Sequence, residues 1–113
     1  MRIGTLAAIG VCLWAAVGAS LATQVMAQSR AVMSQRDIAF APGELRIRAG
    51  EEVVFRNEDP FGHNVFSPDQ GGVFDIGLQQ PETETPVRFS QPGEYNIRCR
   101  IHPKMRALVV VTP

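Results

Sequence analysis

Hydrophobic and polar residues alternate along most of the chain from Asp37 onward. Ile38 and Phe40 alternate with small or polar neighbours, and Leu45 and Ile47 alternate with two arginines. An alternation with a period of two is typical of a β-strand that buries one face. The pattern therefore predicts short, half-buried strands in this part of the chain.

The same reasoning predicts further strands in the segments 53–55, 63–66, 73–78, 87–89, 95–99 and 108–111. Proline and glycine turns separate them, and no apolar stripe is long enough for an amphipathic helix. Residues 28–35 show no clear period and are expected to form a tail or a frayed edge strand. Seven or eight short strands with regular turns predict an all-β Greek-key β-sandwich.

The first 27 residues have a different pattern. Arg2 precedes an almost uncharged apolar run over residues 3–22, and Val25-Met26-Ala27 matches a small-x-Ala cleavage site. This predicts a signal peptide over residues 1–27 and a periplasmic mature domain over residues 28–113. The alternative is an uncleaved anchor, since the run is about long enough to cross a bilayer. We expect cleavage, because one flanking arginine is a weak retention signal.

Length and charge narrow the function classes. A chain of 113 residues allows one domain, and a formal net charge of zero gives no indication of a nucleic-acid partner or an anionic membrane. We expect a monomer without a membrane span after cleavage.

The mature domain contains a single cysteine, Cys99, because Cys12 lies in the leader. An exported protein with one odd thiol suggests intermolecular pairing, a reactive thiol or a metal ligand. Alternation with Tyr95 and Ile97 places Cys99 on the inward face at the end of its strand. A bound metal would protect the sulfur and add folding free energy.

Potential metal ligands follow within the same segment, in the pattern C-x-x-H-x-x-M formed by Cys99, His102 and Met105. His63, far upstream, is the only other histidine of the chain. Thiolate and thioether ligands combined with imidazole select copper, and a His₂Cys set with a weak axial methionine is the blue-copper electron-transfer site. The residues therefore predict one copper ion per chain.

Three alternatives remain open from the residues. Zinc fits less well, because a thioether is a poor zinc ligand. Cys99 and His102 could form the nucleophile and base of a hydrolase, but the motif lacks a third orienting group. A copper carrier that delivers the metal is the third possibility. The mature chain has only Met33 outside the loop, so no methionine-rich carrier site is evident.

The combined motif resembles the cupredoxin family of small type 1 (blue) copper proteins, over roughly residues 38–112. Its short ligand loop is similar to that of the amicyanin branch, whereas plastocyanin-type loops place the methionine further from the histidine. The resemblance implies that Cys99, His63 and His102 are equatorial ligands and that Met105 is the axial ligand. It also implies that Asn64 ties the cysteine and histidine loops together by hydrogen bonding.

The resemblance further implies a one-electron shuttle that is not itself an enzyme. Its partners would be redox proteins, such as a c-type cytochrome or a periplasmic dehydrogenase, and electrons would pass through the edge of His102. The short loop suggests that His102 can swing away and protonate in the reduced state, which would raise the reduction potential at low pH.

Basic residues cluster around the predicted loop: Arg98, Arg100, Lys104 and Arg106. They predict a positive rim and a partner with acidic residues at its docking face, with a salt-dependent encounter rate. The alternative is that they are solvated strand-face charges, partly cancelled near His63 by Glu58 and Asp59.

Overall fold

The computed structural model describes residues 3–5, 7–15, 18, 30–69 and 74–113. Most of the predicted signal peptide, including its cleavage site, lies outside the described residues, so the leader stays a prediction. The described residues before residue 30 belong to no helix or strand. Within the described ranges, no helix has the length and apolar character needed to cross a membrane.

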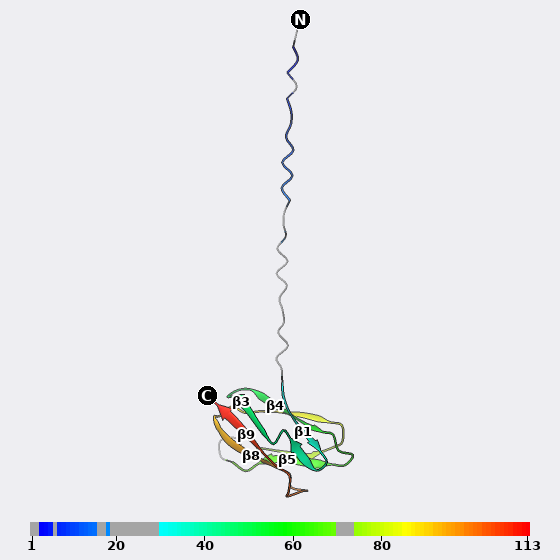
Figure 1. Ribbon diagram of the computed structural model, residues 1–113, viewed down its shortest axis with the longest axis vertical. Helices are drawn as coiled ribbons and strands as arrows, with labels where there is room; N and C mark the ends of the chain where they lie inside the picture. The colour runs from blue at the N-terminus through cyan, green and yellow to red at the C-terminus, as the bar shows by residue number, and fades with distance from the viewer. Residues whose placement is uncertain (1–2, 6, 16–17, 19–29, 70–73) are drawn as a thin grey trace.

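Nine strands in the described residues form two sheets that pack as a sandwich (Figure 1). The first sheet has the order β2-β1-β4-β7 and consists of β1 (Ala31–Arg36), β2 (Ala39–Ala41), β4 (Glu52–Asn57) and β7 (Glu84–Arg88). The second has the order β3-β9-β8-β5-β6 and consists of β3 (Glu44–Arg48), β5 (His63–Ser67), β6 (Phe74–Gln79), β8 (Gly93–Arg98) and β9 (Arg106–Thr112).

The predicted all-β sandwich is confirmed, although the described part of the chain has nine strands instead of seven or eight. The prediction of a tail or frayed edge over residues 28–35 was wrong for the described residues of that segment, because β1 lies inside its sheet between β2 and β4. Its inward positions include Met33 and the fully buried Gln35. A polar side chain at a core position interrupts the apolar alternation, and this concealed the strand in the sequence.

The core lies between the two sheets and follows the predicted alternation elsewhere. On β8 the side chains of Tyr95 and Ile97 are buried, whereas Asn96 between them is exposed. The run over residues 108–111 belongs to β9, which is central in its sheet and buries three consecutive valines. Burying a side chain of this size stabilises the fold by roughly 1.5–3 kcal/mol, so this core fixes the strand ends that follow.

Candidate metal centre

Cys99 follows β8 directly and keeps the inward direction of that strand. It is 2 % exposed and belongs to the same core cluster as Tyr95 and Ile97. The next strand, β9, pairs antiparallel with β8, so residues 99–105 form a tight connection at one end of the sandwich. The N–H of Met105 donates to the carbonyl of His102 at 3.0 Å and closes this turn.

His63 reaches the same end of the molecule through the sheet. It is the first residue of β5, and β5 pairs antiparallel with β8 through Phe66 and Arg98. Because the strands run in opposite directions, the start of β5 lies beside the end of β8. The His63 side chain is fully buried. The fold therefore brings together residues that are 36 or more positions apart.

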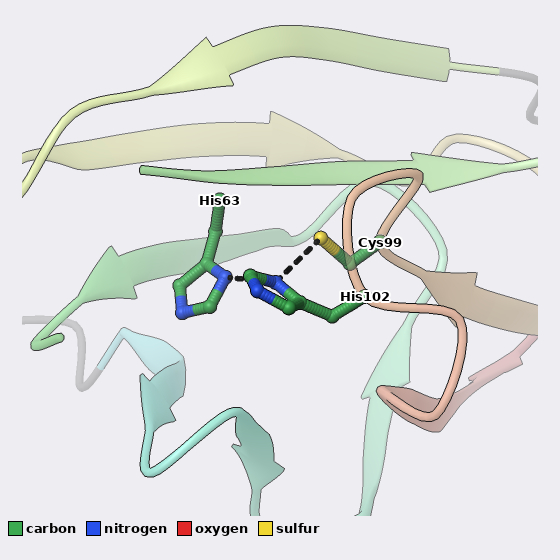
Figure 2. A group of neighbouring side chains, drawn as sticks. All are labelled: His63, Cys99 and His102. Atoms are coloured by element: carbon green, nitrogen blue, oxygen red, sulfur yellow. Dashed lines mark hydrogen bonds between the residues drawn. The ribbon is translucent and has the colours of Figure 1, made fainter. Parts of the chain in front are cut away.

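Three of the four predicted donors, those of His63, Cys99 and His102, converge on one point. His63 Nδ1 lies 3.2 Å from His102 Nδ1, and Cys99 Sγ lies 3.9 Å from the same nitrogen. All three donor atoms lie within 4.8 Å of one another, and Figure 2 shows His102 joined to both neighbours. Donors about 2.0–2.3 Å from an ion in a trigonal arrangement would stand about 3.5–3.8 Å apart. The separations of 3.2 and 3.9 Å lie on either side of this range, and the His₂Cys set forms a candidate copper site.

Met105 lies at the end of the same loop. It is 1 % exposed and is part of the core cluster that also contains Cys99. The assignment of its thioether as the axial ligand is taken up below as a proposal.

Asn64 connects the two halves of the site, as the resemblance implied. Its backbone N–H donates to Cys99 Sγ at 3.3 Å, and its side-chain oxygen accepts the N–H of Arg100 at 3.2 Å. The side-chain amide of Asn64 also donates to Asp75 Oδ1 at 2.7 Å and to the carbonyl of Gly77 at 2.9 Å. One residue beside His63 thus fixes both the sulfur and the chain that follows it.

Asp59 is a functional residue that sequence reasoning misplaced. The sequence suggested a surface charge near His63, but Asp59 is only 5 % exposed and its Oδ2 lies 2.6 Å from His63 Nε2. A carboxylate can only accept a hydrogen bond, so Nε2 carries the proton and Nδ1 is left as a lone pair facing His102. Asp59 therefore sets the tautomer that a metal ligand needs.

The Asp59 carboxylate is itself held by a turn between β1 and β2. The N–H groups of Asp37 and Ile38 donate to its two oxygens at 2.7 and 3.0 Å. Both turn residues have positive φ angles, 54° and 56°, which point their N–H groups in the same direction. The resulting chain of contacts runs from this turn through Asp59 to His63.

These contacts keep Asp59 ionised. Burial raises the pKa of the Asp59 carboxyl. Hydrogen bonds from His63 and from the N–H groups of Ile38 and Asp37 lower the pKa by more than burial raises it. The pKa therefore lies below its ordinary value, and the carboxylate remains an acceptor at neutral pH.

The basic residues around the loop differ in their surroundings. Arg100 pairs with Asp75 at 2.8 Å and lies over the ring of Phe66, 3.9 Å from its centroid. Lys104 and Arg106 are exposed, and Arg98 is half-buried. Glu58 pairs with Arg36 at 2.9 Å and approaches Arg56 at 3.9 Å. Neither acidic residue near His63 therefore acts as a free surface charge.

The comparisons with known proteins agree with this geometry. A family model described as a cupredoxin-like domain matches residues 5–111. Amicyanin-alpha of Methylorubrum extorquens is 33 % identical over 110 residues, which cover 94 % of this chain and 92 % of the relative. Chloroplast plastocyanin of Fritillaria agrestis is 37 % identical over 109 residues, 84 % of this chain and 65 % of the relative.

Solved structures show the same fold. Amicyanin from Paracoccus versutus superposes with a TM-score of 0.67 and 25 % identity, over 74 % of this chain and 82 % of that chain. A copper-containing nitrite reductase from Thermus scotoductus gives a TM-score of 0.69 and 27 % identity over 75 % of this chain, but only 23 % of the larger enzyme. With its two-sheet fold, its His-Cys-His cluster and a family match across nearly its whole length, the chain belongs to the cupredoxin-like domain family.

Proposed function

We propose that the protein is an exported type 1 copper protein that shuttles single electrons between redox partners. The observation that carries this proposal is the convergence of His63, Cys99 and His102 at the end of a rigid sandwich. The bound metal would supply the reversible one-electron couple. The chain supplies the fixed surroundings in which that couple works.

The proposed ligands are Cys99, His63 and His102, with Met105 as a weak axial donor. Each of the first two is held by a neighbour: the Asn64 N–H contacts the sulfur, and Asp59 orients His63. Ligands that do not move between oxidation states favour fast exchange, because little rearrangement accompanies the electron. Cys99 and His63, each buried and each held by a neighbouring residue, are therefore suited to electron transfer.

The same burial argues against the two other functions that the sequence left open. A carrier that releases its metal needs exposed donors, whereas Cys99 and His63 are 2 % and 0 % exposed. A hydrolase needs a nucleophile within about 2.6–3.2 Å of its base and open to substrate. Cys99 Sγ is buried and lies 3.9 Å from His102 Nδ1.

His102 is the proposed entry and exit point for electrons. It is half-buried, whereas His63 is enclosed, and it lies on the loop beside the exposed Pro103. Phe61, 41 % exposed, packs near both rings with centroid distances of 5.3 Å to His63 and 5.8 Å to His102. A c-type cytochrome or a dehydrogenase would approach this end, in the periplasm if residues 1–27 act as the predicted leader.

The test is the visible spectrum and voltammetry of the Cu(II) protein. We expect an intense absorption band at the red end of the spectrum from thiolate-to-copper charge transfer, and a reversible one-electron wave. Cys99→Ser should abolish the band. A weakly coloured complex without a reversible wave would contradict the proposal.

The axial ligand needs its own variant. Met105→Leu keeps the side-chain volume nearly unchanged and should raise the reduction potential while the blue colour persists, because the axial ligand tunes the potential. Met33→Leu is the matched control, since Met33 is also fully buried in the core. Equal potentials in the two variants would exclude Met105 as a donor.

A further inference from the structure

Two arginines face each other on the outer side of the five-stranded sheet. Arg98 on β8 and Arg106 on β9 are directly opposed in the antiparallel register. The adjacent opposed pair, Ile97 and Ala107, is buried, so the two arginines point away from the core. Side chains at opposed positions have Cβ atoms about 4.5–5.5 Å apart, and like charges there are destabilising.

The neighbouring strands continue this row without neutralising it. Phe66 on β5 is opposite Arg98, and Asp75 on β6 is opposite Phe66. The single carboxylate of the row is already engaged, because Asp75 pairs with Arg100, which lies over the Phe66 ring. The row therefore has two positive charges in excess.

No other carboxylate in the chain compensates for them. Every Asp and Glu of the sequence lies in the described residues, and none has an oxygen within 4.0 Å of a nitrogen of Arg98 or Arg106. Of the six ion pairs in the described residues, one belongs to Arg100 and the other five lie elsewhere in the molecule. An uncompensated pair of opposed arginines is the arrangement expected where an external anion binds.

The two side chains border an open hollow. It has a volume of about 260 Å³ and is lined by Phe66, Arg98, Cys99, Arg100, Pro103 and Arg106. Its wall thus includes three residues of the connection over residues 99–105, namely Cys99, Arg100 and Pro103. A group held here would lie beside the candidate copper site and outside the sandwich.

We propose that Arg98 and Arg106 bind the carboxylate of an acidic side chain on the surface of a redox partner. This rests on the proposed electron-transfer function and identifies the charged part of the partner's docking face. Guanidinium groups match a carboxylate with paired hydrogen bonds. A partner side chain is favoured over a free anion, because the hollow is open and continuous with the loop on which His102 lies.

The binding test uses a hexaglutamate peptide as the probe and the Cu(I) protein, followed by NMR at low ionic strength. We expect shifts of the Arg98 and Arg106 side-chain Nε–H signals that saturate with peptide and disappear at high salt. Arg98→Gln and Arg106→Gln should each weaken binding at least threefold. Arg46→Gln is the matched control, because Arg46 is exposed on β3 of the same sheet, opposite Val110, and should leave binding unchanged.

A stability measurement separates a binding role from a structural one. Removing one of two opposed like charges relieves repulsion, so Arg98→Gln should keep or raise the melting temperature of the copper-free protein. A lowered melting temperature together with unchanged peptide binding would overturn the proposal.

Two further outcomes are decisive. If inorganic phosphate displaces the peptide and binds more tightly than it does, the hollow is a free-anion site and the assignment to a partner is wrong. Peptide binding to the copper-free protein does not depend on the redox site. A failed voltammetry experiment with intact peptide binding would therefore overturn the proposed function, and with it the redox nature of the partner, but not the carboxylate site. A reversible wave without peptide binding would overturn this inference alone.

Discussion

The two buried ligands of the site are held in contrasting ways. His63 is supported from the opposite sheet, through Asp59 and the turn between β1 and β2. Cys99 is supported within its own sheet, through Asn64, and Asn64 is braced by Asp75 at the surface. The carboxylate that supports His63 is buried, with Asp59 only 5 % exposed, whereas the support of Cys99 ends in a solvent-exposed ion pair. The hydrogen bonds of Asp59 and Asp75 have similar lengths, 2.6 and 2.7 Å, but should contribute very different free energies to stability.

The largest effect is expected from Asp59→Ala. This variant leaves the buried ring N–H of His63 and the half-buried N–H groups of the turn at Asp37 and Ile38 without their acceptor, which should cost about 3 kcal/mol. Metal affinity should fall about 10- to 100-fold, because His63 loses the group that fixes its tautomer. Urea unfolding of the copper-free protein and copper competition titration measure the two effects. Unchanged values would show that the buried support is not stronger than the exposed one.

A smaller effect is expected from Asn64→Ala. The variant keeps the backbone N–H that contacts Cys99, but it loses the side-chain links to Arg100, Asp75 and Gly77. We expect a loss of about 1–2 kcal/mol in the free energy of unfolding and a broadened, shifted charge-transfer band. A stable variant with an unaltered spectrum would remove Asn64 as the link between the loops.

Asp75→Asn tests the exposed end of the same support. The pKa of Asp75 is lowered to about 2, first by the hydrogen bond from Arg100 and then by Gly77 and Asn64. A lowered folded-state pKa means that the contribution to stability is complete above about pH 4 and is lost as the pH falls through 2. The Asp75 side chain is 41 % exposed, so the difference from the unmodified protein should stay below about 1 kcal/mol.

Unfolding curves of the two proteins should therefore converge as the pH approaches 2. Asp69→Asn is a control on the same sheet face, since Asp69 accepts hydrogen bonds from Asn96 instead of an arginine. A difference for Asp75→Asn that is independent of pH would mean that the ion pair with Arg100 is not its source.

The smallest effect concerns the charges around the loop and affects rate, not stability. Electron exchange with hexacyanoferrate(III) should slow with rising ionic strength, because the anion is attracted to a positive surface. Lys104→Gln should weaken this dependence slightly, by about twofold in rate at low salt. A rate that does not change with salt would remove the steering role of the whole basic rim.

The sequence was sufficient to predict the fold class and the His-Cys-His cluster, for different reasons. Alternation along each strand records which face is buried, so Tyr95, Ile97 and Cys99 could be placed inward. The cluster could be predicted because the chain has only two histidines and, beyond the predicted leader, one cysteine. Neither argument depends on knowing which strands are neighbours.

The positions that sequence reasoning missed depend on long-range contacts. Asp59 occurs in a polar turn after Asn57 and looks exposed, but its burial results from the turn at Asp37 and Ile38, more than twenty residues away. The buried amide of Gln35 donates a hydrogen bond to the side chain of Gln79, which is 44 residues away in the sequence. No local pattern carries this information. The one sequence signal of the contact between Asp59 and His63 was their spacing of four residues. That spacing alone does not show that the two side chains meet.

The turn between β1 and β2 has a consequence for how such a centre can be adjusted. Ile38 is a branched residue with a positive φ of 56°, a conformation that costs about 1–3 kcal/mol and persists only where its surroundings enforce it. Replacing it with glycine would remove this cost, because glycine adopts a positive φ without a steric penalty, but it would also make the turn that donates to Asp59 less rigid. The rigidity of the proposed copper site would thus depend in part on a hairpin of the other sheet that contributes no donor atom.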